Sequence, residues 1–197
     1  MQVFLETPRL VLRRFTLADV DNLVSLNADP DVMRFITGGI PIGRVEIEDE
    51  LLPAFLGYYE RFDGYGFWAA VEKRTGEFLG CFYLTPPEDG APGEAELGFR
   101  LRKSAWGKGY ATEGSRALIR RGFTEFGVQC VVADTVAGNI ASRRVLEKAG
   151  LRLVRTSQQS SPYPVEGGES GDVEYALRKA DWEQQDQAVG RNPIGQS

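Results

Sequence analysis

Apolar and polar residues alternate in several short runs of the chain, and this period of two is typical of strands. Arg9 to Phe15 alternates apolar and basic side chains, as a half-buried strand does. Other runs are rich in aromatic and β-branched residues and are bounded by turn residues. These predicted strands are Phe67 to Val71, Phe78 to Leu84, Ala95 to Leu101, Cys130 to Thr135, Leu151 to Thr156 and Val173 to Leu177. The pattern therefore predicts six to seven strands.

Apolar residues at helical spacing predict about four helices between these strands. The first follows Thr16 and ends near Asp29-Pro30, and the second runs from about Val45 to Phe62, where Pro53 should kink or divide it. The others are Thr112 to Phe126 and Ser142 to Ala149, each followed by a glycine suited to a helix C-terminus.

The order of elements predicts an α+β fold built around a single mixed, strongly twisted sheet. We expect one domain over residues 1–182. The stretch 157–171 is a polar loop rich in Ser, Pro and Gly, longer than most connections, and is therefore functional or mobile. The tail 183–197 shows no apolar period and is predicted to be disordered.

Composition narrows the class of protein. A chain of 197 residues with 42% hydrophobic and 26% charged residues is typical of one globular domain. The net charge of −5 argues against nucleic acid as a partner, because that binding needs a basic surface. No apolar run reaches the roughly 20 residues that span a bilayer, so we expect a cytoplasmic protein without a membrane partner.

Histidine is absent, which removes the commonest general base and the commonest zinc ligand. The two cysteines, Cys81 and Cys130, lie in apolar runs without metal-ligand spacing, and we interpret them as buried thiols. The sequence thus predicts no metal site. Any acid-base chemistry must use Glu, Asp, Tyr, Lys or Cys.

A glycine-containing turn between a predicted strand and a predicted helix is the strongest candidate for a site. Gly107 and Gly109 would let an anion approach the main chain, and the positive end of the following helix would favour a phosphate. By itself the signal is weak, because a short Gly-x-Gly turn before a helix is often only a tight connection. It is not a Walker motif, because no Gly-Lys-Ser/Thr follows.

The segment Trp106-Gly-Lys-Gly-Tyr-Ala-Thr-Glu113 resembles the acyl-CoA-binding motif of the GNAT superfamily of N-acetyltransferases, and the RimJ/RimL-type branch most of all. The resemblance covers residues 6–182. Four further segments agree with it in order: Glu6-Thr-Pro-Arg-Leu-Val-Leu-Arg13, Glu96-Leu-Gly-Phe-Arg100, the run from Asn139 to Gly150, and Tyr175-Ala-Leu to Asp181-Trp182.

The resemblance implies the GNAT fold, in which the strand before the turn and the next strand splay apart around the thioester-bearing arm of acetyl-CoA. It implies that Phe99, Arg100 and Leu101 contact the pantetheine. The implied pyrophosphate site comprises Trp106, Gly107, Lys108, Gly109, Tyr110, Ala111 and Thr112. Trp106 departs from the Gln or Arg that opens the superfamily pattern, but a backbone cradle does not need that side chain.

Asn139 and Ser142 stand at the start of the last predicted helix, where both are also ordinary capping residues. The resemblance implies that Asn139 contacts the pantetheine arm and that Ser142 lies near the sulfur, where it assists the leaving thiolate. For both residues, a helix-capping role and a contact with the cofactor remain open.

Transfer to an amine needs a proton acceptor, because an amine with a pKa near 10.4 is almost wholly protonated at neutral pH. Glu96 is our leading base, since it lies on the strand that enters the turn and shares a face with Gly98. Glu94 competes on the same face, and a water relay or another residue stays open. Glu113, in the first turn of a helix, is better explained by the helix dipole.

These observations predict an enzyme that moves an acetyl group from acetyl-CoA to a primary amine, on a protein N-terminus or a small molecule. Two alternatives remain: a CoA-sensing or partner-binding protein without catalysis, and a transferase that uses another donor such as succinyl-CoA. A homodimer is also left open.

Overall fold

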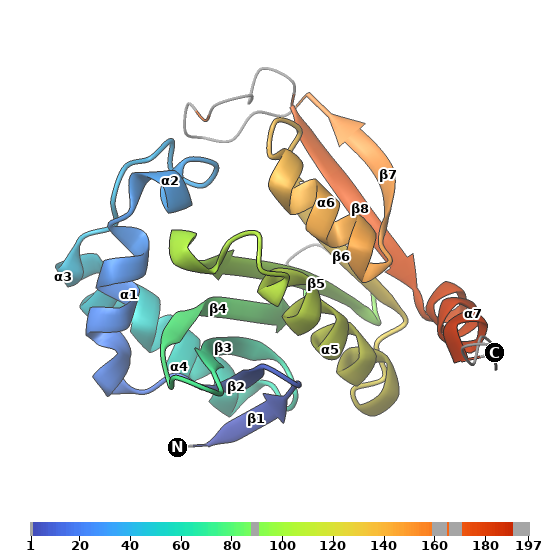
Figure 1. Cartoon of the computed structure of the whole chain (residues 1–197), viewed down its shortest axis with the longest axis horizontal. Helices are drawn as coiled ribbons and strands as arrows, with labels where there is room; N and C mark the ends of the chain where they lie inside the picture. The colour runs from blue at the N-terminus through green and yellow to red at the C-terminus, as the bar shows by residue number, and fades with distance from the viewer. Residues whose placement is uncertain (1, 88–90, 159–164, 166–170, 191–197) are drawn as a thin grey trace, which may run out of the picture.

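The computed structural model describes residues 2–87, 91–158, 165 and 171–190, and it is an α+β fold with one eight-stranded sheet (Figure 1). The strands lie in the order β1-β2-β3-β4-β5-β6-β8-β7. Their bounds are β1 Val3–Glu6, β2 Leu10–Arg14, β3 Gly66–Glu72, β4 Phe78–Thr85, β5 Glu94–Leu101, β6 Cys130–Val136, β7 Arg152–Ser157 and β8 Asp172–Arg178. The predicted loop 157–171 falls mostly outside the described residues.

The sheet is mixed, as predicted. Strands β5 and β6 pair in parallel, and the other six pairings are antiparallel. The strand that the pattern did not predict is β1, a four-residue edge strand whose Val3 is exposed. So short a strand offers too few positions for alternation to be recognised.

The helical segments correspond to the four predicted helices, with several short additions. Their bounds are η1 Leu17–Asp19, α1 Val20–Asn27, α2 Pro30–Met33, α3 Arg44–Glu46, η2 Ile47–Leu51, α4 Leu52–Arg61, η3 Lys103–Ala105, α5 Tyr110–Glu125, α6 Ile140–Ala149 and α7 Lys179–Gly190. None of the helices in the described part of the chain combines the length and apolarity needed to cross a bilayer.

The predicted break at Pro53 takes the form of a π-helical turn. Over η2 the helix widens, and the Leu52 N–H donates to the Ile47 carbonyl five residues earlier. Proline has no N–H to continue the regular ladder, so the segment divides just before it.

The expectation that residues from 183 onward lack structure is wrong as far as Gly190, where α7 ends. Trp182 packs on Phe123 of α5 with ring centroids 5.4 Å apart, and Asp186 pairs with Arg120 at 3.0 Å. These tertiary contacts stabilise a helix that has no continuous apolar face, which is why periodicity missed it. Residues 191–197 lie outside the described part.

Two groups of helices cover the two faces of the sheet (Figure 1). Helix α5 packs Leu118, Ile119 and Phe123 into the larger apolar core, to which α6 contributes Leu146. On the other face a second core joins α1 and α4 to the sheet through Leu23 and Phe55. Strand β4 contributes side chains to both cores, whereas the buried apolar side chains of β5 belong to the larger core.

Candidate active site

Strands β5 and β6 pair only where they begin. Three residue pairs join them, and the last pair is Glu96 with Val132. Beyond it, β5 continues its pairing with β4 up to Leu101, while β6 continues with β8 up to Val136. The two parallel strands therefore separate after Glu96, and an opening forms toward their carboxyl ends.

The backbone of β5 directs some of its polar groups into this opening. The Arg102 N–H donates to Leu79 on β4, whereas the Gly93 carbonyl accepts from Cys130 on the β6 side. Because the two sides alternate along a strand, the N–H groups of Phe99 and Leu101 point away from β4 and into the opening. The Arg100 N–H points toward β4 instead.

Two helices begin at the same edge of the sheet. Strand β5 leads through η3 into α5, and β6 leads through residues 137–139 into α6. Parallel neighbours place their carboxyl ends together, so the N-termini of α5 and α6 flank the opening. Both present the positive end of a helix dipole, which favours an anionic ligand.

The turn before α5 has the geometry of an anion cradle. Gly107 (φ 72°) and Gly109 (φ 83°) both adopt left-handed conformations. The amides of the first α5 turn, from Tyr110 to Thr112, have no carbonyl partner within the helix. The Trp106 indole N–H donates to the Leu101 carbonyl at 2.8 Å, which pins the turn to the end of β5.

Arg9 and Glu113 stabilise this turn through hydrogen bonds. Arg9 donates from Nη1 to the Lys108 carbonyl at 2.9 Å and from Nε to Glu113 at 2.6 Å. The Thr7 hydroxyl donates to the same carboxylate at 2.6 Å. Burial alone would raise the pKa of Glu113, but these hydrogen bonds outweigh it and the pKa is lowered. Glu113 thus has a structural role here.

Tyr110 packs and does not face the opening. Its hydroxyl donates to Glu72 at 2.6 Å, and the Arg9 guanidinium lies 4.6 Å from its ring centroid. The hydrogen bond to Glu72 raises the pKa of Tyr110. The contribution of this residue to the cradle is therefore its backbone amide.

Asn139 caps α6. Its side-chain oxygen accepts from the Ser142 N–H at 3.1 Å, so the capping interpretation is confirmed for Asn139. The cap uses only the oxygen, and the amide nitrogen of the side chain stays available as a donor. Ser142 lies in the first turn of α6, beside the opening.

Glu96 is held where the strands separate. The Tyr83 hydroxyl donates to Glu96 Oε1 at 2.9 Å. Burial, together with the charge of Glu96, raises the pKa of Tyr83 above its ordinary value of 10.0, so Tyr83 stays protonated and acts as the donor. Gly98 makes room for this contact, because a Cβ there would lie 2.0 Å from Tyr83 Cζ.

Glu94, the competing carboxylate, is engaged elsewhere. It accepts from the Ala91 N–H at 2.9 Å, in the turn that precedes β5. It also lies at the first paired position of β5, two residues before the strands separate. The geometry therefore favours Glu96 over Glu94 as the carboxylate nearest the opening.

Sequence reasoning missed Asp134, a second carboxylate on the same face. Asp134 lies on β6, two residues after Val132, the partner of Glu96, and so its side chain is on the side of Glu96. Partial burial and the negative charges of Glu174 and Glu96 raise its pKa above the ordinary value. An acidic residue in the otherwise apolar run Cys130–Val136 was the available signal.

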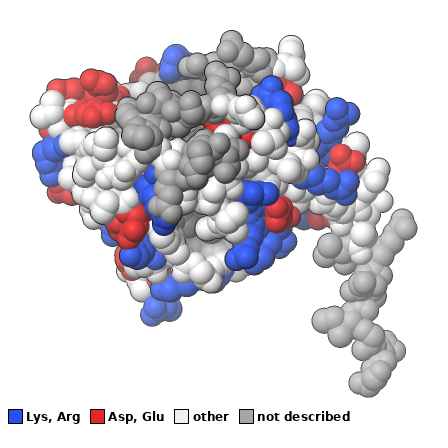
Figure 2. Space-filling model, turned by 90° about the horizontal axis from the view of Figure 1, so that it is seen from above, with Lys and Arg blue, Asp and Glu red and all other residues white. Residues whose placement is uncertain are grey.

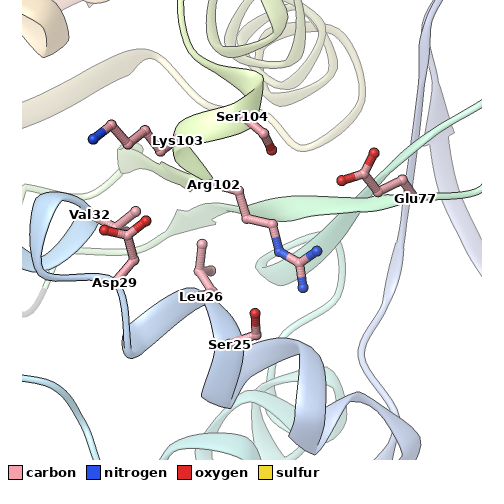
Figure 3. Close-up of a pocket in the computed structure, with 8 residues that line it drawn as sticks. All are labelled: Ser25, Leu26, Asp29, Val32, Glu77, Arg102, Lys103 and Ser104. Carbon is pink, nitrogen blue, oxygen red and sulfur yellow. The ribbon is translucent and has the colours of Figure 1, made fainter.

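A small cavity of about 220 Å³ lies on the other side of η3, between α1 and the end of β5 (Figure 3). Arg102 extends across it toward Ser25, and Ser104 and Glu77 lie on the side away from Asp29. The Arg102 guanidinium lies 5.1 Å from the Phe78 ring centroid, and no described residue hydrogen-bonds its buried Nε. None of the predicted site residues lines this cavity.

Comparison with known proteins now defines the class. Residues 9–152 match the model of an acetyltransferase (GNAT) domain. The chain therefore belongs to the GNAT family, and it is an acetyl-CoA-dependent N-acetyltransferase.

Two curated relatives and one solved structure illustrate the likeness. The chain is 32% identical to an FsC-acetyl coenzyme A-N(2)-transacetylase of Aspergillus fumigatus, over 92% of this chain and 78% of the relative. It is 35% identical to the uncharacterized protein YkkB of Bacillus subtilis, over 77% and 87%. The fold is shared with a spermidine N-acetyltransferase of Vibrio cholerae, with a TM-score of 0.71. The match covers 90% of this chain and 99% of that structure, at 15% sequence identity.

Proposed function

We propose that this protein acetylates a primary amine that enters on the face of the sheet carrying Glu96, with Glu96 as the general base. The observation that carries the proposal is the position of Glu96. It occupies the last position of β5 that pairs with β6, beside the opening, and receives a hydrogen bond from Tyr83. A carboxylate at this position would lie within the proposed site, and the hydrogen bond from Tyr83 fixes its orientation.

Acetyl-CoA is held mainly by backbone groups in this proposal. The amides from Gly107 to Thr112 bind its pyrophosphate, and the amides of Phe99 and Leu101 bind the pantetheine arm in the opening. The side-chain N–H of Asn139 donates a hydrogen bond to the same arm. The left-handed glycines and the uncompensated α5 amides support this assignment.

The transfer needs no nucleophilic residue. The neutral amine attacks the thioester carbon, an N–C bond forms, and the amine proton passes to Glu96. The C–S bond then breaks, and the thiolate leaves toward Ser142, whose hydroxyl assists it. Backbone N–H groups of β5 stabilise the oxyanion between these two events. Asp134 is the alternative base, because it lies on the same face as Glu96 and its surroundings raise its pKa above the ordinary value.

The family branch is proposed from the resemblance of the sequence motif, and the class of amine acceptor from the charge near Glu96. We place the chain in the RimJ/RimL-type branch on its Trp106 to Glu113 motif. Asp134 lies near Glu96 on one face, and the negative charge of these two carboxylates favours a cationic amine, whereas Glu174 is already paired with Arg155 at 2.7 Å. Two named relatives act on an N2 amine and on spermidine. We therefore favour a small cationic amine over a peptide N-terminus as the acceptor.

An amine panel tests the proposal. Three acceptors are each mixed with acetyl-CoA: spermidine, an ornithine derivative with a free N2 amine, and a short peptide. The rate is followed by the release of the coenzyme A thiol, and the acetylated product is identified by mass spectrometry. We expect the two small cationic amines to be acetylated faster than the peptide. Binding of acetyl-CoA without turnover of any amine would instead support a sensor, and preference for succinyl-CoA in competition would change the donor.

A further inference from the structure

The face of β5 that carries Glu96 also carries an arginine. Side chains alternate between the two faces of a strand, so Arg100 lies on the same face as Glu96 and Gly98, about 13 Å along the strand from Glu96. Its register partner on β4 is Cys81, which belongs to the core shared with α1 and α4. Strands β5 and β6 separate after Glu96, so Arg100 flanks the opening on the face where the amine is proposed to enter.

A buried amide holds the Arg100 guanidinium in place. Its Nη1 donates to the side-chain oxygen of Asn27, the last residue of α1. Asn27 is fully buried, and its side-chain nitrogen donates to the Leu23 carbonyl at 2.7 Å, so the orientation of this amide is fixed. The guanidinium therefore has a defined position, although its partner carries no charge.

The positive charge of Arg100 is not compensated by a carboxylate of the described residues, none of which forms an ion pair with it. Within the described part of the chain, Nε and Nη2 have no hydrogen-bond partner, and neither atom is fully buried. A guanidinium presents its N–H donors in a planar fork that matches a carboxylate. Arg100 thus offers fixed and accessible donors to an anionic group.

Tyr83 lies between the two charged groups of this face. Its ring lies over Gly98, and its hydroxyl donates to Glu96 at 2.9 Å. Burial and the charge of Glu96 raise the pKa of Tyr83, and the charge of Arg100 acts in the opposite direction, so both charges act on this one side chain. Tyr83 is also partly exposed. A small acceptor that lies on Tyr83 would therefore have a carboxylate at one end and a guanidinium at the other.

The rest of the surface gives no general preference for an anion. The net charge is −5, and on the face seen in Figure 2 acidic and basic side chains are interspersed. Near the opening, the negative charges of Glu96 and Asp134 repel an anion. Arg100 is therefore suited to the anionic end of a ligand whose cationic end faces these two carboxylates.

We infer that the amine acceptor carries a carboxylate and that Arg100 binds this group, which makes the acceptor an amino acid or a derivative with a free carboxylate. The inference rests on the proposed function, in which the amine of the acceptor reaches Glu96. Arg100 then determines specificity: its guanidinium binds the acceptor carboxylate, while Glu96 and Asp134 attract the amine.

The competing explanation is structural. Through Asn27, Arg100 joins α1 to β5, and it would stabilise the fold without any preference among acceptors. Removal of the guanidinium lowers the stability of the protein under both explanations, so a denaturation experiment does not separate them. They differ in one observable, the preference of the enzyme for an acid over the corresponding amide.

Steady-state kinetics with matched acceptors measures this preference. L-ornithine is compared with L-ornithinamide, and 4-aminobutyrate with 4-aminobutanamide, because each pair differs in the charge of one group. In the wild type we expect kcat/KM for the better acid to exceed that of its amide by roughly 10- to 100-fold, mainly through KM, as a charge-assisted contact implies.

Variants then assign the preference to one residue. Arg100→Gln should reduce the ratio of acid to amide to about one by raising KM for the acid, with KM for the amide and acetyl-CoA affinity nearly unchanged. Arg102→Gln removes the next arginine along the chain and is the matched control, which should keep the wild-type ratio. Arg100→Lys keeps the charge without the planar fork and should retain part of the preference.

The outcomes are distinguishable. A wild-type ratio near one for both pairs overturns the inference and leaves the proposed function standing, and this measurement needs no variant to fold. A preference that survives in Arg100→Gln, or that is lost in Arg102→Gln, also overturns the inference. Turnover of no amine by the wild type would overturn the proposed function as well.

Discussion

The Tyr83 hydroxyl donates to Glu96 at 2.9 Å, across a position that only glycine can occupy. Tyr83 lies on β4 and Glu96 on β5, and the intervening residue on the β5 face is Gly98, the register partner of Tyr83. The tyrosine ring thus lies over Gly98 and fixes the direction of the carboxylate where β5 and β6 separate.

Removing this hydroxyl should slow the reaction without weakening the cofactor site. In Tyr83→Phe the ring still packs against Phe67, but Glu96 loses its donor. We expect kcat to fall about tenfold, which corresponds to one hydrogen bond of about 1.4 kcal/mol. Steady-state kinetics and acetyl-CoA titration check this. Unchanged kcat would show that Tyr83 does not position the base.

Gly98→Ala should both destabilise the fold and disturb Glu96. The added Cβ would lie 2.0 Å from Tyr83 Cζ, so the ring must move. We expect a loss of about 1–3 kcal/mol in the free energy of unfolding, and a lower kcat. The control is Gly57→Ala in α4, where a Cβ meets nothing within 4 Å and helix propensity predicts a small gain. Equal stability of the two variants, measured by urea denaturation, would contradict the close approach.

Gly109→Val should abolish acetyl-CoA binding. Gly109 has φ 83°, and Gly127, which follows α5 at the end away from the cradle, has φ 70°. A valine at either position is strained, at a cost of about 1–2 kcal/mol. If the cradle binds the pyrophosphate, only Gly109→Val should lose affinity in calorimetry, while Gly127→Val keeps it. Retained binding in Gly109→Val would exclude the cradle.

Glu113→Gln should lower stability in a pH-dependent way. The pKa of Glu113 is lowered in the folded protein, so the stability that this carboxylate contributes is present above its ordinary value of 4.5 and is lost as pH falls through the folded pKa. We expect wild type to exceed the variant by about 1–3 kcal/mol at pH 7, with the difference shrinking below pH 4.5. Urea denaturation at several pH values measures it. A difference that is constant with pH would contradict the Arg9–Glu113 brace.

Periodicity predicted the elements that have a continuous apolar face. The run from Ala95 to Leu101 and the helix that begins near Thr112 were found because their side chains alternate or recur regularly. The helix α7 was missed, because Trp182 and Asp186 hold it by contacts with α5 that no local pattern encodes. Strand β1 was missed because it is short.

The candidate site was predictable where it depends on backbone shape. Glycines at 107 and 109 and the strand-turn-helix order indicate a cradle, since only glycine adopts left-handed φ freely. The side chains that brace or orient it come from distant segments. Arg9 reaches Glu113 across more than 100 residues, and Tyr83 reaches Glu96 from the neighbouring strand, so neither follows from spacing.

The most direct test of the account is the rate of acetyl transfer by Glu96→Gln under saturating acetyl-CoA, measured in a single turnover on the best amine of the panel. The account predicts a rate reduced by roughly 10²–10⁴, as for loss of a general base, with acetyl-CoA affinity nearly intact. Asp134→Asn, measured beside it, should be slowed far less. Wild-type turnover in Glu96→Gln, or a larger loss in Asp134→Asn, would contradict the assignment of Glu96 as the base.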